Sequence, residues 1–238
     1  AANNEIGVLQ PIEDIARLCR ALGVVFHTDA SQAIGKVPFD VEAVGADLVS
    51  FTAHKFYGPK GVGALWVRRK AVEVAIQMHG GGHERGLRSG TLNVPGIVGL
   101  GKACELCRLE GPEEARRLGA LRDRLLATLR AALPDLVVNG SLAHRLPQNL
   151  NVSFPGIDAE SLAIAMDGVA ISSGSACATG KPKPSAVLKA LGLPDDLAFA
   201  SLRFGLGRWT TEADVEFVAS KTTAVIRRLR EVRAALEG

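Results

Sequence analysis

Residues 50–61 read SFTAHKFYGPKG, in which the end of an apolar segment runs directly into His54 and Lys55. The apolar residues predict a strand over Asp47–Thr52, and the Gly-Pro turn that follows predicts another strand over Val62–Val67. A residue just beyond a strand end lies where proteins of the α/β class bind their ligands. Lys55 is therefore the first candidate functional residue.

The sequence before this segment also alternates helix and strand. A helix is predicted over Ile12–Leu22, because Pro11 precedes it and Gly23 follows it. A short buried strand is then predicted over Val24–Thr28. This alternation predicts an α/β sheet with ligands at the carboxyl ends of its strands, and we assign residues 1–110 to it.

A second block begins near Gly111-Pro112, after a helical run over Ile97–Leu109 and before a long amphipathic helix over Glu113–Leu133. Further strands are expected at Leu136–Val138, Leu150–Phe154, Ala170–Ser172 and Ser201–Phe204, and helices at Ala159–Met166, Pro184–Leu191 and Glu212–Leu236. Helices and strands without strict βαβ order predict a smaller α+β domain over residues 111–238.

The composition excludes several classes of protein. The 238 residues are 47% hydrophobic, which excludes an intrinsically disordered chain. Positive and negative charges nearly cancel, with a net charge of +3. This balance does not favour binding to nucleic acid or to an anionic membrane, so we expect neither partner. No apolar run approaches the ~18 residues of a transmembrane helix, and no signal peptide is evident.

The cysteines indicate a reducing compartment, and we expect a cytoplasmic protein. Four cysteines are too few for a disulfide scaffold. Cys104 and Cys107 form a CxxC, which could suggest zinc or redox chemistry. They fall inside an apolar helical run without a second CxxC or a paired histidine, so a structural role is favoured and no metal site is expected.

Lys55 and Asp29 together suggest a cofactor. Asp29 closes the expected strand in FHTDASQAIGK (residues 26–36), and a carboxylate at an apolar strand end is costly unless it pairs with a cation. A partly buried lysine with a carboxylate on a neighbouring strand is what pyridoxal phosphate requires, since the lysine forms the Schiff base and the carboxylate keeps the ring nitrogen protonated. The alternative is a surface lysine that buries its stem and keeps its amine in water.

Five motifs closely resemble, in the same order, the cysteine desulfurases among the fold-type I pyridoxal-phosphate enzymes. These are ANNEIG (residues 2–7), FHTDASQAIGK (26–36), SFTAHKFYGPKG (50–61), HGGGHERGLRSGT (79–91) and SSGSACATG (172–180). The resemblance implies the aspartate-aminotransferase-like fold of this α/β class. Residues 1–110 would be the C-terminal part of its cofactor-binding large domain, and residues 111–238 the small domain.

The resemblance also implies the residues that hold pyridoxal 5'-phosphate. Lys55 looks like the Schiff-base lysine, and Asp29 looks like the partner of the pyridine nitrogen. Asn4 and Gln32 resemble the amides that hydrogen-bond the phenolic oxygen of the cofactor.

Three further motif positions resemble phosphate ligands. Thr52 and His54 match two of these ligands, and Thr91 matches a phosphate ligand that reaches into the neighbouring subunit's site, which implies a homodimer. Arg203 resembles the arginine that binds the substrate α-carboxylate, and a guanidinium grips a carboxylate bidentately. An ordinary ion pair is the alternative for Arg203.

Cys177 lies in a segment rich in small residues that precedes Lys181-Pro182-Lys183-Pro184. A cysteine in an exposed loop beside basic residues is typical of a reactive thiolate. The resemblance makes Cys177 the nucleophile that takes sulfur from L-cysteine as a persulfide and leaves L-alanine. The segment around Cys177 resembles the long loop of the subgroup of cysteine desulfurases that passes sulfur to iron-sulfur scaffold proteins and tRNA-thiolation acceptors.

The chain departs from the family because it opens AANNE without an initiator methionine and lacks the long segment that precedes ANNEIG in family members. That segment supplies a phosphate-binding loop and a histidine that stacks on the cofactor. We therefore expect this chain alone to bind pyridoxal phosphate weakly and to turn over cysteine poorly; a strong cofactor absorption band with normal sulfide release would contradict this.

Three other functions stay open: a selenocysteine lyase, an aminotransferase of the same fold, and an inactive truncated partner subunit. Cys177 argues against the aminotransferase, which needs no nucleophile there.

Overall fold

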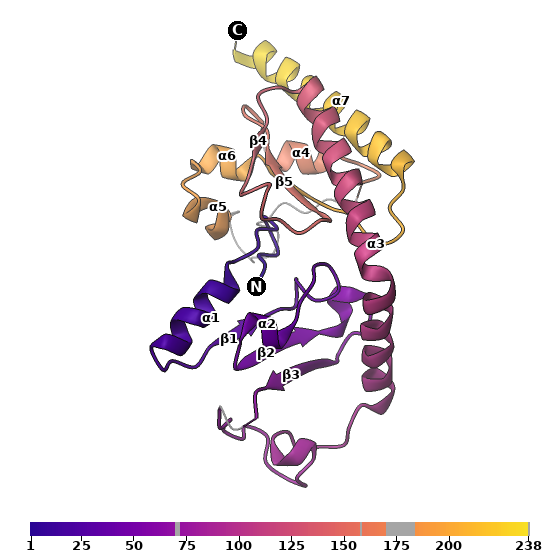
Figure 1. The fold of residues 1–238 in the computed structure, drawn as a ribbon. Helices are drawn as coiled ribbons and strands as arrows, with labels where there is room; N and C mark the ends of the chain where they lie inside the picture. The colour runs from indigo at the N-terminus through magenta and orange to yellow at the C-terminus, as the bar shows by residue number, and fades with distance from the viewer. Residues whose placement is uncertain (70–71, 158, 170–183, 238) are drawn as a thin grey trace. The chain divides into compact units, whose positions relative to one another are not determined.

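The computed structural model describes residues 1–69, 72–157, 159–169 and 184–237. The chain divides into two compact units (Figure 1). Ala1–Ala2 and Leu9–Pro112 form the first unit, and Asn3–Val8 and Glu113–Gly238 form the second. The short segment Asn3–Val8 thus belongs to the second unit although it lies near the start of the chain.

The first unit contains a three-stranded sheet in the order β1-β2-β3. Its strands are β1 (His27–Asp29), β2 (Leu48–Thr52) and β3 (Gly63–Val67). β1 pairs in parallel with β2, and β2 pairs antiparallel with β3. Helices α1 (Ile12–Ala21) and α2 (Val41–Val44) and the 3-10 turns η1 (Ala53–Phe56) and η2 (Glu84–Gly86) complete the unit with the first part of α3.

The predicted buried strand over Val24–Thr28 is wrong in its first half. Val24 and Val25 are 54% and 52% exposed, and β1 begins only at His27. The Gly23 N–H donates to the Arg20 carbonyl oxygen and the Val24 N–H to the Cys19 carbonyl oxygen, the pattern that closes a helix through a left-handed glycine. The end of α1 therefore uses the backbone groups that a strand would need.

Helix α3 (Val94–Ala132) runs unbroken through Pro112, whereas the sequence suggested a break at Gly111-Pro112. Proline removes one backbone donor and normally ends or kinks a helix. Packing on both sides offsets this cost, since Ala103 is buried in the first unit and Leu118 is buried in the second. Tertiary contacts thus outweigh the local preference of the proline.

The second unit is built on an antiparallel sheet in the order β4-β5-β6. Its strands are β4 (Val137–Val138), β5 (Asn149–Ser153) and β6 (Ser201–Gly205), and its helices are α4 (Ala159–Ala165), α5 (Ala186–Ala190), α6 (Asp195–Phe199) and α7 (Glu212–Glu237), with the second part of α3. The sequence did not predict α2 or α6. The strand expected at Ala170–Ser172 lies outside the described residues.

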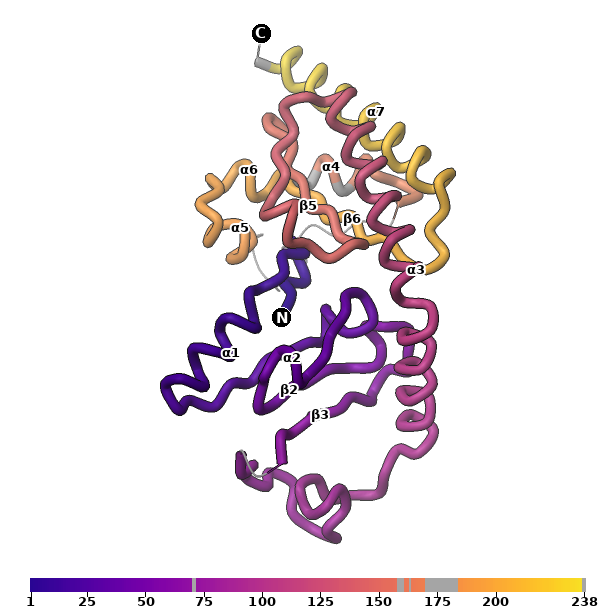
Figure 2. Tube along the Cα trace, viewed as in Figure 1, coloured from indigo at the N-terminus to yellow at the C-terminus, as the bar shows by residue number. Residues whose placement is uncertain are grey.

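Helix α7 runs along the C-terminal part of α3, as the chain trace shows (Figure 2). Arg124 of α3 forms ion pairs with Glu212 and Glu216 of α7. At the far end, Arg230 of α7 binds Asp135 with its Nη2 2.6 Å from Oδ2. Exposed ion pairs contribute little to stability, so the apolar core beneath them supplies most of it.

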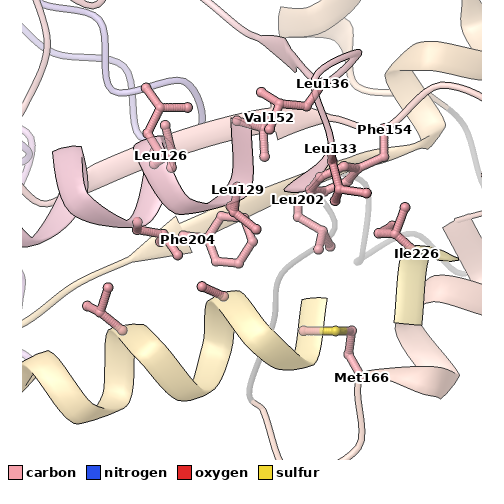
Figure 3. Packing of buried hydrophobic residues seen from close by; sticks show 14 of the residues in the cluster. Leu126, Leu129, Leu133, Leu136, Val152, Phe154, Met166, Leu202, Phe204 and Ile226 are labelled. Atoms are coloured by element: carbon pink, nitrogen blue, oxygen red, sulfur yellow. The ribbon is translucent and has the colours of Figure 1, made fainter. Parts of the chain in front are cut away.

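That core fills the space between α3, α7 and the sheet (Figure 3). Leu129 of α3 is fully buried beside strand residues such as Leu202 and Phe204, and Ile226 of α7 joins the same cluster. A side chain of this kind contributes roughly 1.5–3 kcal/mol by leaving water.

Buried amides attach Asn3–Val8 to the second unit. Nδ2 of Asn149 and Nδ2 of Asn151 both donate to the carbonyl oxygen of Glu5, at 3.3 and 3.2 Å. Asn151 in turn accepts a hydrogen bond of 2.7 Å from Asn139. Since unpaired buried polar groups are costly, this network favours one position for the segment.

No helix within the part of the chain that the structure describes has the length and apolar character required to cross a membrane.

We predict that Leu129→Ala lowers the free energy of unfolding by about 2–5 kcal/mol, because it leaves a cavity in the core of the second unit. Urea unfolding followed by circular dichroism measures the loss. Leu236→Ala is the matched control, since Leu236 is 83% exposed. Equal losses in the two variants would contradict the assignment of the core.

Candidate functional site

The candidate site begins at the carboxyl ends of β1 and β2. The two strands are parallel, with Asp29 in register with Ser50. Asp29 ends β1 and Thr52 ends β2, so the residues that follow both strands meet at one edge of the sheet. The structure therefore brings together the segment after Asp29 and the segment that contains Lys55.

Asp29 is exposed and is held by its own loop. Its Oδ1 accepts a hydrogen bond of 2.8 Å from the Ser31 N–H. Partial burial acts to raise the pKa of Asp29, but hydrogen bonds from the side chain and backbone of Ser31, together with the charges of the terminal ammonium and of His27, lower the pKa. Asp29 is thus exposed at the end of its strand, and its carboxylate is ionised at neutral pH.

Thr52 and His54 form a polar pair at the end of β2. Thr52 Oγ1 lies 2.9 Å from His54 Nδ1 and also donates to the Val62 carbonyl oxygen at 3.3 Å. The hydrogen bond with Thr52 fixes the His54 ring, so its other nitrogen can serve a ligand. A hydroxyl and an imidazole held side by side suit a phosphate-sized anion.

Lys55 lies in η1, where two exposed residues stand between two buried ones. Ala53 and Phe56 are buried, whereas His54 and Lys55 are exposed. Tyr57 ends the turn in the left-handed conformation with φ 68°. The predicted partial burial of Lys55 is therefore wrong for this chain, because apolar packing of the turn places the amine on the solvent side.

Gln32 lies in the turn that follows β1. Its Oε1 accepts a hydrogen bond of 3.2 Å from Lys36 Nζ. The sequence reasoning missed Lys36, although its spacing of four residues from Gln32 was visible in QAIGK. Burial, with a smaller contribution from the charge of Lys55, lowers the pKa of Lys36 to about 8, while Cys107 acts in the opposite direction.

Two of the predicted residues lie in the second unit. Arg203 extends from β6, and its Nη1 donates to the carbonyl oxygen of Asn4 at 3.0 Å. The preceding Asn3 accepts hydrogen bonds from the N–H groups of Glu5 and Ile6, which shapes the backbone around Asn4. Asn4 and Arg203 are therefore neighbours despite their separation in the sequence.

The last two predicted residues are Thr91 and Cys177. Thr91 is exposed in the first unit, at the end of the glycine-rich loop 77–91, and its carbonyl oxygen accepts from Arg88 at 3.5 Å. Cys177 lies outside the described residues. Across the described ranges, no group of three or more His, Cys, Asp or Glu side chains could hold a metal ion.

The sequence of the chain is similar to one protein family and to proteins of closely related names. Residues 1–218 match the family described as Aminotransferase class-V. The chain is 60% identical over 232 residues to "Cysteine desulfurase IscS" of Anaeromyxobacter sp. (strain Fw109-5), covering 97% of this chain and 57% of that protein. It is 48% identical over 231 residues to "Cysteine desulfurase" of Homo sapiens, covering 97% of this chain and 50% of that protein.

Solved structures show the same relationship. A "NifS-like protein" superposes with a TM-score of 0.86 at 38% identity and covers 96% of this chain and 60% of its own. The "NifS-like protein from Rickettsia africae ESF-5" gives 0.85 at 28% identity, with 95% and 60% covered. The chain thus spans little more than half the length of the relatives it matches.

We predict that Gly35→Ala destabilises the first unit beneath the candidate site. Its φ is +76°, and a Cβ there would lie 2.6 Å from Cys107 Sγ and 2.9 Å from Phe56 Cβ. Backbone strain of ~1–2 kcal/mol and overpacking of ~1–3 kcal/mol should add. Gly23→Ala is the control, because Gly23 has φ +67° but nothing within 4 Å. Chemical unfolding gives the free energy of unfolding of both variants, and the difference between their losses measures the crowding at Gly35. Equal losses in the two variants would show that Gly35 is not closely packed.

Proposed function

Because the chain belongs to the aminotransferase class-V family, we propose that it carries the catalytic residues of a pyridoxal-phosphate-dependent cysteine desulfurase. The observation that carries this proposal is the 60% identity to a cysteine desulfurase over 97% of the chain. The proposed reaction converts L-cysteine to L-alanine and leaves the sulfur on Cys177 as a persulfide.

The residues at the carboxyl edge of β1 and β2 fit pyridoxal phosphate by their chemistry. Asp29, ionised at neutral pH, can pair with a protonated pyridine nitrogen. The hydroxyl–imidazole pair of Thr52 and His54 can bind the phosphate group. The exposed amine of Lys55 is accessible for a covalent bond to the cofactor aldehyde, and Gln32 has an amide that can donate to the phenolic oxygen.

When bound, the cofactor supplies an electron sink that acidifies the substrate Cα–H bond. Lys55 Nζ, once released from the cofactor, takes the proton from the substrate Cα. Arg203 binds the substrate α-carboxylate through its guanidinium, and its bond to the Asn4 carbonyl oxygen restrains its orientation. These residues orient the substrate and move one proton at a defined atom.

Cys177 Sγ, as the thiolate, attacks the substrate sulfur. The new S–S bond forms as the substrate C–S bond breaks, and the electron pair of that bond remains with the carbon fragment that becomes alanine. The persulfide on Cys177 then passes its outer sulfur to an acceptor, for which iron-sulfur scaffold proteins are the proposed class.

The proposal extends to the organisation of the protein. Residues 1–110 hold the cofactor, and residues 111–238 form the small domain that carries Cys177. A homodimer is proposed because Thr91, in an exposed loop, matches a ligand that serves the neighbouring subunit's phosphate. We place the protein in the cytoplasm, where a catalytic cysteine stays reduced.

We predict that Lys55→Ala removes the visible absorption that a covalent lysine–cofactor bond produces and lowers sulfide release by roughly two to four orders of magnitude, since it deletes the base. Borohydride reduction followed by mass spectrometry checks which residue carries the cofactor. Lys60→Ala is the matched control, because Lys60 is an exposed lysine in the same motif. Labelling of any residue other than Lys55 would contradict the cofactor assignment.

We predict that Cys177→Ser abolishes sulfide release and protein persulfide while leaving cofactor binding unchanged, because serine lacks the thiolate nucleophile. Persulfide-selective alkylation and absorption spectroscopy measure the two properties on the same sample. Cys19→Ser serves as the control, since Cys19 is a half-buried cysteine of α1. Desulfuration by Cys177→Ser at the wild-type rate would overturn the persulfide mechanism.

A further inference from the structure

Lys36 is a charged residue of the first unit that the proposed reaction does not use. It is half-buried in the turn after β1, and this turn is fixed to β2 because the Ala30 N–H donates to the Ser50 carbonyl oxygen at 2.8 Å. The Lys36 N–H donates to the Ala33 carbonyl oxygen at 3.0 Å. The backbone at Lys36 is therefore linked, through Ala33 and Ala30, to the strand that leads into Lys55.

The side chain of Lys36 contacts the amide of Gln32. Lys36 Nζ lies 3.2 Å from Gln32 Oε1. A lysine ammonium has three donors and no acceptor, so it can bond only the oxygen of a glutamine amide. The Gln32 amide is therefore held in one of its two possible orientations, with its N–H2 group available to a ligand that accepts hydrogen bonds.

We propose that Lys36 is a positioning residue that orients the Gln32 amide so that its N–H2 group donates to the phenolic oxygen of pyridoxal phosphate. This inference rests on the proposed function, because it assumes that Gln32 binds this cofactor. Lys36 itself makes no bond to the cofactor and acts through Gln32.

The surroundings of Lys36 make its hold on the Gln32 amide depend on pH. The titratable groups that face it are Lys55 on η1 and Cys107 on α3. Burial and repulsion from Lys55 lower the pKa of Lys36 to about 8, while Cys107 raises it. Below this pH the ammonium holds Gln32 in one orientation. Above it the neutral amine can also accept a hydrogen bond, and the restraint on the amide is lost.

The test measures the dissociation constant of pyridoxal phosphate for the wild-type chain and four variants at pH 7. Lys36→Met removes the donor and should weaken binding roughly threefold to tenfold, the value of one hydrogen bond. Lys36→Arg keeps a group that only donates and should retain most of the affinity. Gln32→Ala should weaken binding as well, and Lys60→Met, an exposed control, should leave it unchanged.

A double mutant separates positioning from a simple charge effect. If Lys36 acts through Gln32, then Lys36→Met has no further effect on affinity in the Gln32→Ala background. The visible absorption of the bound cofactor gives a second, spectroscopic readout for the same variants. Loss of a donor to the phenolic oxygen destabilises the phenolate, so the pH midpoint of this absorption should rise. Affinity in the wild type should also fall above pH 8 more steeply than in Lys36→Met.

The outcomes distinguish the two proposals. Unchanged cofactor affinity in both Gln32→Ala and Lys55→Ala would overturn the proposed cofactor site itself. Weakened binding in Gln32→Ala with unchanged binding in Lys36→Met would overturn the positioning role alone, as would an equal effect of Lys36→Met with and without Gln32. If Lys36→Met does not fold, Lys36→Gln replaces it, because glutamine both donates and accepts and should also weaken binding.

Discussion

The parallel pairing of β1 with β2 is the interaction on which the candidate site depends. Asp29 is in register with Ser50, and the next N–H, that of Ala30, donates to the Ser50 carbonyl oxygen. This pairing brings the turn after β1 and the 3-10 turn after β2 to one edge of the sheet. A shift of one residue would turn the buried Thr28 outward and displace one turn along the other by one residue. The turn that carries Asp29 and Gln32 and the turn that carries Lys55 lie at the same sheet edge because this register holds.

Apolar contacts beneath the edge keep the polar groups in place. Ala53 and Phe56 are buried against Ala103 of α3, and this packing leaves His54 and Lys55 of the same turn exposed. The imidazole and the amine of η1 are therefore exposed because the apolar side chains of the same turn are buried. Gly35 belongs to the same arrangement, because its lack of a side chain lets Cys107 and Phe56 approach the turn after β1. A change in this packing can disturb the site without touching a functional group.

Local patterns predicted the strands and long helices well where turns and apolar runs mark their ends. Strand β2 begins one residue after its predicted start and ends at the predicted Thr52. The predictions of element ends were wrong where an interaction outside the local pattern was stronger than that pattern. Packing on both sides carries α3 through Pro112, and the glycine closure of α1 takes up the backbone of Val24. The burial predicted for Lys55 was wrong because burial depends on how a turn packs, which no window of sequence contains.

The residue types in their motif order determined the chemistry available: an amine, a carboxylate, an amide, and a hydroxyl beside an imidazole. Tertiary structure decided which of these groups meet. Only the fold joins the Glu5 carbonyl oxygen to the amides of Asn149 and Asn151 and thereby puts Asn4 beside Arg203. Only the fold half-buries Lys36 and places it close enough to Lys55 and Cys107 for their charges to act on its pKa. The physical reason is that desolvation and hydrogen-bond satisfaction act between residues far apart in the chain, and these terms select one arrangement among the many that local patterns allow.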